Sequence, residues 1–221
     1  MAMNHEPMTE LIVLRHGETW WNVEGRLQGH LDSGLSLLGV LQAEAIARRL
    51  GQERFAGLYS SDLGRALQTA EPIARATGLA IMTDSRLRER NLGFFQGLTM
   101  AEILERFPDD HRRFVSGEPD HVVPGGESGR QRYERTVTCV NEIAARHAGE
   151  RVLIVTHGGV LSGLLRRALG VDLAIPLSYR LFNATINTFF VRQGAWKLGS
   201  WGDIHHLRDI GTIEAGAEAN A

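Results

Sequence analysis

Cysteine, metal-ligand clusters and long apolar runs are scarce or missing in this sequence. Its single cysteine, Cys139, excludes an intramolecular disulfide. No stretch approaches the roughly 20 consecutive apolar residues that a membrane helix needs. The first residues also lack the pattern of a secretory signal. We therefore expect a soluble, cytoplasmic protein that does not bind a membrane.

The sequence also lacks an excess of basic residues: it has 24 Lys and Arg against 26 Asp and Glu, which gives a net charge of -2. Nucleic acids call for surplus positive charge, so they are not expected partners. Metal-ligand spacing is also absent: His205 and His206 are adjacent, and adjacent residues of a strand point to opposite faces. We expect no metal and no cofactor. Any bound anion must be met by a few basic residues gathered in a pocket.

Short apolar runs alternate with longer stretches of helical periodicity, which is typical of an α/β fold. At 221 residues, a single domain spanning 1–221 is expected. The ends, 1–9 and 211–221, lack periodicity, and we expect both to be poorly ordered. Strands are expected at 11–14, 57–59, 152–155, 186–191 and 196–201, and helices at 36–50, 62–78, 99–114, 128–148 and 160–169.

Local signals support several of these helices. Ser36 is a suitable N-cap for the first helix. Its expected buried stripe is Leu38, Leu41, Ala45, Ile46 and Leu50. Pro72 lacks a backbone N–H and should kink or divide the second helix. Thr99 and Glu102 have the spacing of a capping box at the head of the third.

The segment from about 93 to 126 interrupts the alternation, and we expect it to form a helical lid over the ligand crevice. Its basic residues either select the ligand or form a solvated helix face, and the sequence leaves both open: Arg106, His111, Arg112 and Arg113. Its aromatic residues either line the pocket mouth or, as is commoner, belong to a core: Phe94, Phe95, Phe107 and Phe114.

Two segments share one layout, in which an apolar strand runs directly into a histidine and a glycine. They are LIVLRHGET, which contains His16, and VLIVTHGG, which contains His157. Ligands of open parallel sheets bind at the carboxyl ends of the strands, where both histidines would lie. Gly158 and Gly159 allow close approach of the backbone, and the helix that follows points N–H donors at an anion.

A third segment, LYSSDLGRALQTA, places Arg65 one turn into a helix near the same sheet edge. Arginine presents a rigid fork of donors that matches phosphate oxygens. Taken alone, a histidine at a strand end is more often hydrogen-bonded structure than a catalyst. Arg15, Arg65 and the two histidines together predict a phosphate pocket.

The motifs RHGETWWN, SSDLGRA, LRERNLG and VTHGG, in this order, resemble the signature segments of the histidine phosphatase superfamily, the phosphoglycerate-mutase-like fold. The similarity spans roughly 11–207, because RLQGHLDSGLSLLGVLQA and PGGES match habitual segments of the family and GDIHHL resembles the closing segment of some phosphatases. The resemblance implies a three-layer αβα sandwich with a mostly parallel central sheet.

By position, the resemblance implies that His16 attacks phosphorus through one ring nitrogen while the other donates to a backbone carbonyl. Arg15, Arg65 and His157 would hold the phosphoryl oxygens without a metal ion. Further contacts to phosphate or substrate are implied for Asn22, Gln28, Gly29 and Gly158. The implied partner is a small phosphate ester.

Glu89, within DSRLRERNLG, takes the place of the family's general acid. It would protonate the leaving oxygen and then activate the water that hydrolyses phosphohistidine. As an alternative, Glu89 is one member of a solvated charge run with Arg88 and Arg90. In the context of the motif we favour catalysis.

Four functions fit parts of this pattern. We favour a phosphatase, because the basic insertion of cofactor-dependent mutases is missing between Glu89 and His157. A 2,3-bisphosphoglycerate-dependent phosphoglycerate mutase is the alternative. A non-catalytic phosphate-binding module would need neither His16 nor Glu89, and a metal-dependent hydrolase lacks ligand spacing. A homodimer stays open.

Overall fold

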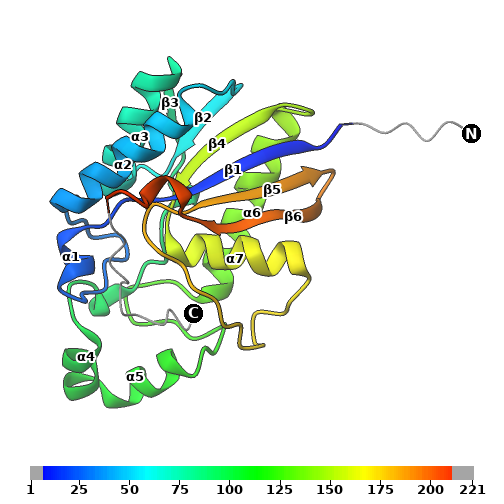
Figure 1. Cartoon of the computed structure of the whole chain (residues 1–221). Helices are drawn as coiled ribbons and strands as arrows, with labels where there is room; N and C mark the ends of the chain where they lie inside the picture. The colour runs from blue at the N-terminus through cyan, green and yellow to red at the C-terminus, as the bar shows by residue number, and fades with distance from the viewer. Residues whose placement is uncertain (1–6, 211–221) are drawn as a thin grey trace, which may run out of the picture.

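One six-stranded sheet organises residues 7–210, the part of the chain that the computed structural model describes (Figure 1). Its strands are β1 (Thr9–Arg15), β2 (Gly57–Ser60), β3 (Ile81–Thr83), β4 (Arg151–Thr156), β5 (Ile186–Arg192) and β6 (Ala195–Asp203). The order across the sheet is β3-β2-β4-β1-β5-β6. The pairs β3/β2, β2/β4 and β4/β1 are parallel, whereas β1/β5 and β5/β6 are antiparallel.

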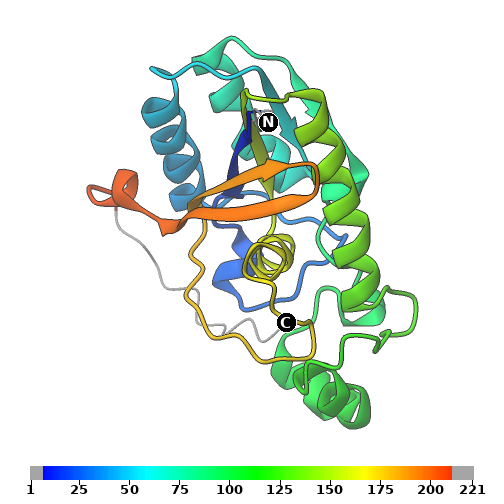
Figure 2. The ribbon, with the colours of Figure 1, turned by 90° about the vertical axis from the view of Figure 1, so that its right-hand side faces the viewer.

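Helices cover both faces of this sheet. They are α1 (Trp20–Val23), α2 (Leu37–Leu50), α3 (Gly64–Thr77), α4 (Met100–Arg106), α5 (Pro108–Val115), α6 (Gly129–Arg146) and α7 (Gly158–Leu169), with short 3-10 turns at Ser85–Leu87, Gly93–Phe95 and His205–Leu207. Figure 2 shows α2 on one side of the sheet and α6 on the other. The prediction of a three-layer α/β fold with a mostly parallel sheet is confirmed.

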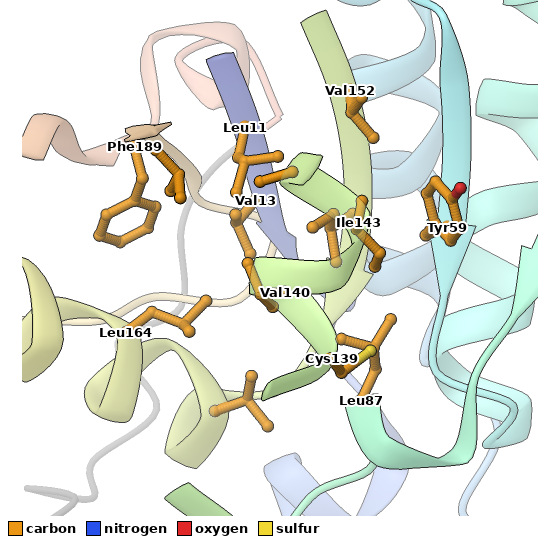
Figure 3. Close-up of a cluster of buried hydrophobic side chains, with 14 of the residues drawn as sticks. Leu11, Val13, Tyr59, Leu87, Cys139, Val140, Ile143, Val152, Leu164 and Phe189 are labelled. Carbon is orange, nitrogen blue, oxygen red and sulfur yellow. The ribbon is translucent and has the colours of Figure 1, made fainter. Parts of the chain in front are cut away.

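The alternation of side chains along β1 builds two cores. Leu11 and Val13 point into the cluster under α6 and α7 (Figure 3), and Ile12 and Leu14 point into the cluster under α2 and α3. None of the four is more than 3% exposed. Each such side chain contributes about 1.5–3 kcal/mol by leaving water, so the strand that carries His16 is held firmly.

The structure corrects three expectations about the first half of the chain. Thr9 is not poorly ordered: it is buried in β1, and its hydroxyl donates to the carbonyls of Ala144 and His147. β3 was not expected. Leu41 is 52% exposed rather than part of the buried stripe. The face of α2 is set instead by Gly39, where any Cβ would overlap the carbonyl oxygen of Glu18.

Pro72 does not divide the second helix, because α3 runs through it from Gly64 to Thr77. Pro72 is buried together with Ala66, Ala70 and Ile73, and this apolar burial offsets the missing hydrogen bond. The expected tail, 211–221, and residues 1–6 lie outside the described residues.

The segment expected as a lid contains two helices where one was expected. The capping box of Thr99 and Glu102 is confirmed at the start of α4. The helix ends at Arg106 because Phe107, the residue before proline, avoids helical torsions, and Pro108 then begins α5 at a position that suits proline. A separate apolar cluster joins these helices. It contains buried Leu92, Phe95, Ile103 and Val123, with Phe94, Phe107 and Phe114 partly buried against it.

Candidate active site

A cavity of about 500 Å³ opens where β1 and β4 end. Its lining includes Arg15 and His16 from the end of β1, Arg65 from the start of α3 and Glu89 from the loop after β3. Every predicted site residue except His157 lines this cavity. His157 lies beside it, with its ring centroid 5.2 Å from that of His16. The structure thus brings the predicted residues together, because β1 and β4 are paired neighbours.

His16 is buried and held as one tautomer. Its Nδ1 lies 2.8 Å from the carbonyl oxygen of Gly17, so Nδ1 carries the proton and donates it. Nε2 is then left with a free lone pair. Burial, followed by the charges of Arg65 and Arg15, holds the pKa of His16 well below its usual 6.5. A neutral imidazole at pH 7 is a competent nucleophile.

His157 is fixed through Ser61. Nε2 of His157 lies 2.8 Å from Ser61 Oγ, and Oγ also accepts from the backbone N–H of Leu63. The hydroxyl proton is therefore free to point at Nε2, which leaves Nδ1–H as a donor. Burial, then the charge of Arg65, lowers the pKa of His157 well below its usual value.

Both arginines have a buried Nε donor that the protein leaves unmatched. Nη1 of Arg65 donates to the carbonyl of Leu31 and to the carboxylate of Asp32. Its Nη2 donates to the carbonyl of Gly29. Arg15 Nη1 donates to the carbonyl of Leu181. Within residues 7–210, the buried Nε atoms of both arginines and Nδ1 of His157 have no hydrogen-bond partner. Buried donors normally find partners, so three of them around one histidine suit a bound oxyanion.

Glu89 is positioned by backbone donors on both carboxylate oxygens. Oε1 accepts a hydrogen bond from the N–H of Arg90, and Oε2 accepts one from the N–H of Gly159. The donor–acceptor distance is 2.8 Å in both. The loop that bears Glu89 is held by Arg135, which donates to the carbonyls of Arg86, Arg88 and Glu89. These bonds fix the direction of the Glu89 side chain. They contradict the alternative that Glu89 is one member of a solvated charge run.

The remaining predicted contacts lie on one wall of the cavity. Asn22 accepts from the N–H and hydroxyl of Thr19, and Gln28 donates to the same hydroxyl. Gly29 adopts a positive φ of 54° and gives its carbonyl to Arg65. Asn22 and Gln28 therefore stiffen the wall beside His16.

Sequence reasoning missed several residues of the site. Asn183 donates to the carbonyl of His16, while His121, Arg132 and Tyr179 line the cavity. By contrast, the basic residues named for the lid do not line it: Arg106, His111, Arg112 and Arg113. Their position favours the solvated-face alternative. Of the lid aromatics, Phe114 reaches the lining, and Phe95 is wholly in the core.

Residues 7–210 contain no group of three or more His, Cys, Asp or Glu side chains arranged to hold a metal ion. Among the helices of the same range, none combines the length and hydropathy needed to span a bilayer.

Comparisons with known proteins agree with this geometry. The model of the histidine phosphatase superfamily (branch 1) matches residues 11–204. Phosphoglycerate mutase-like protein 4 of Arabidopsis thaliana is 41% identical over 211 residues, which cover 94% of this chain and 90% of that protein. The metal-independent phosphoserine phosphatase of Arabidopsis thaliana is 40% identical over 217 residues, which cover 97% of this chain and 90% of that protein.

A solved structure extends the likeness to the fold. Bacillus stearothermophilus YhfR superposes with a TM-score of 0.84 at 35% identity, covering 90% of this chain and all of the other. This protein belongs to the histidine phosphatase superfamily, branch 1, as its motifs indicated. It is an enzyme of the phosphatase type, with mutase-like relatives.

Proposed function

We propose that this protein hydrolyses small phosphate monoesters, without a metal ion, through a phosphohistidine intermediate on His16. The observation that carries the proposal is the state of His16: it is buried, its Nδ1 is engaged by a carbonyl, and unmatched donors of Arg15, Arg65 and His157 surround it. This arrangement fits a nucleophile facing a phosphoryl group.

In the first step, Nε2 of His16 attacks phosphorus and the bond from phosphorus to the ester oxygen breaks. The leaving oxygen takes a proton from Glu89, so an alcohol departs and the phosphoryl group stays on nitrogen. The donors of Arg15, Arg65 and His157 stabilise the charge on the transferring oxygens. Because they are already fixed by the fold, little reorganisation is needed.

In the second step, Glu89 accepts a proton from water, and the resulting hydroxide attacks phosphorus. The bond from phosphorus to nitrogen breaks, which releases inorganic phosphate and restores neutral His16. The low pKa of His16 favours this departure, since the ring leaves as an uncharged base.

The test is phosphate release from p-nitrophenyl phosphate and 3-phosphoglycerate in excess chelator, comparing wild type with His16→Ala. We expect release by wild type and a loss of roughly 10³-fold or more in the variant. A radiolabelled ester, quenched in alkali, should leave label on His16. His205→Ala, an exposed position outside the cavity lining, is the control. Undiminished release by His16→Ala would overturn the proposal.

A mutase is the second candidate, because several relatives bear mutase or mutase-like names. It predicts that 3-phosphoglycerate isomerises faster than it releases phosphate, which the same samples measure. We also propose the cytoplasm as the compartment, supported by the lone, buried Cys139. The homodimer stays a prediction.

A further inference from the structure

A second set of unmatched polar groups lines the same cavity, on residues other than those around His16. Arg132 on α6 is 4% exposed, and its Nε and Nη1 have no hydrogen-bond partner within residues 7–210. His121, from the loop before α6, is 2% exposed, and neither of its ring nitrogens has a partner there. Leaving so many buried polar atoms unpaired is costly, which suggests a ligand that pairs with them.

The charge of Arg132 strengthens this argument. Among residues 7–210 its Nε and Nη1 have no hydrogen-bond partner, and the carboxylate that acts most strongly on it, Glu89, has both oxygens bonded to backbone N–H groups. Burial lowers the pKa of Arg132, and Glu89 opposes that shift, but a guanidinium keeps its charge. A buried cation whose donors are not hydrogen-bonded is costly to a protein. An anion placed against it would be bound strongly.

The location of Arg132 indicates which part of a substrate it meets. A Cβ at Gly159 would lie 2.3 Å from Glu89 Oε1 and 2.6 Å from Arg132 Nη1, so the carboxyl and the guanidinium flank one point. In the proposed reaction Glu89 protonates the ester oxygen. The group next to that oxygen, on the alcohol side, therefore lies beside Arg132.

His121 is held in its place by Arg90, which donates to the carbonyls of His121 and Glu127. Burial, then Arg113 and Arg90, lowers the pKa of His121 from its usual 6.5. A neutral ring offers one N–H donor and one acceptor. It can donate to an anion and still accept from a hydroxyl or ammonium group.

We propose that Arg132 and His121 form an anion subsite for the leaving group, which binds a carboxylate a few bonds from the ester oxygen. The substrates would be phosphate esters of short hydroxy acids. This proposal rests on the proposed function, because it uses the position of Glu89 in that reaction. Arg132 would bind the carboxylate through its Nε and Nη1 donors, in the forked geometry that arginine favours.

The experiment compares two esters that differ by one carboxylate, phosphoserine and phosphoethanolamine. The readout is the ratio of their kcat/KM values. We expect wild type to favour phosphoserine, and Arg132→Gln to reduce the ratio by roughly tenfold to a hundredfold. Arg130→Gln is the matched control, since Arg130 lies on the same helix, pairs with Asp120 and does not line the cavity. An unchanged ratio in Arg132→Gln would overturn the subsite.

Two further measurements keep the test decisive. If Arg132→Gln does not fold, Arg132→Lys and His121→Asn take its place. Each should lower the ratio, because the first removes the forked guanidinium donors and the second removes the imidazole N–H. If wild type releases phosphate from neither ester, the proposed function fails. The subsite is then tested by calorimetric binding to His16→Ala. Tighter binding of phosphoserine than of phosphoethanolamine, lost with Arg132→Gln, supports it, and equal binding overturns it.

Discussion

The backbone N–H of Gly159 donates a 2.8 Å hydrogen bond to Oε2 of Glu89, 70 positions earlier in the chain. This bond joins the first turn of α7 to the loop that carries the candidate acid. A Cβ at Gly159 would lie 2.3 Å from Glu89 Oε1 and 2.6 Å from Arg132 Nη1, so a larger residue there displaces the ends of both side chains. The adjacent Gly158 is less constrained, since its Cβ would meet Arg15 Nε at 3.4 Å.

Gly159→Ala should therefore lower kcat/KM by roughly tenfold to a hundredfold, as Glu89 is moved from its position. Gly158→Ala serves as the comparison and should lose less. The measurement is steady-state phosphate release from p-nitrophenyl phosphate, together with thermal unfolding to show that both variants fold. Equal losses in the two variants would show that the contact with Glu89 does not matter.

Arg135→Gln should destabilise the protein and slow the reaction together. The side chain donates to three carbonyls of 86–89 and pairs with Glu127 at 2.6 Å, so its loss removes three hydrogen bonds from this loop and leaves Glu127 without this ion pair. We expect the free energy of unfolding in urea to fall by about 2–4 kcal/mol. Arg146→Gln on the same helix, whose side chain is 61% exposed and 3.8 Å from Glu142, should change it by less than about 0.5 kcal/mol. A similar change in both variants would contradict the role of Arg135.

Stability should fall as the pH drops below about 6.5. The pKa values of His16 and His157 are lowered in the folded protein, so the unfolded chain takes up protons there that the folded chain does not. Each histidine then removes up to about 1.4 kcal/mol per pH unit until its folded pKa is reached. Urea unfolding at pH 7.5, 6.5 and 5.5 measures the slope. His157→Asn should make it shallower, and an unchanged slope would argue against a lowered pKa.

Phe95→Ala should weaken the lid before it weakens the sheet. Phe95 is fully buried in the cluster around α4 and α5, which is separate from the two clusters on the sheet. We expect a loss of about 3–5 kcal/mol in the stability of this region. Hydrogen exchange should speed up in α4 and α5 more than in β1 and β4. Leu104→Ala, at a position of α4 that is 52% exposed, should have little effect.

The parts of the site that could be predicted are those that follow strands. His16 and His157 each follow a strand built on a continuous apolar run, with one polar residue between the run and the histidine, and that pattern predicts both at one sheet edge. Their convergence with Arg65 follows from the pairing of β1, β4 and β2. The helix boundaries were also close, because Ser36, Thr99 and Ser128 are N-caps with strong local signals.

Arg132 could have been found, although it was not. It occupies the same helical stripe as Thr136, Val140 and Ile143, all of which are buried. An arginine on an apolar stripe indicates a buried cation. His121 has no such signal, since it lies in a loop whose path depends on tertiary contacts such as the bond from Arg90. Leu41 was misplaced because the backbone contact of Gly39, which only the fold shows, sets the face of α2.

The pairing of β1 with β4 and β5 determines when, during synthesis and folding, β1 can enter the sheet. Leu14 is aligned with Val155 on one side and with Ile186 on the other. Until both distant strands have been synthesised, β1 is an apolar segment with two open edges, and such segments associate with other chains. Folding is therefore expected to be slow for the chain's size, because its central contacts are non-local. During synthesis, the strand that bears His16 therefore gains both of its sheet partners only after β5, at 186–192, has been made.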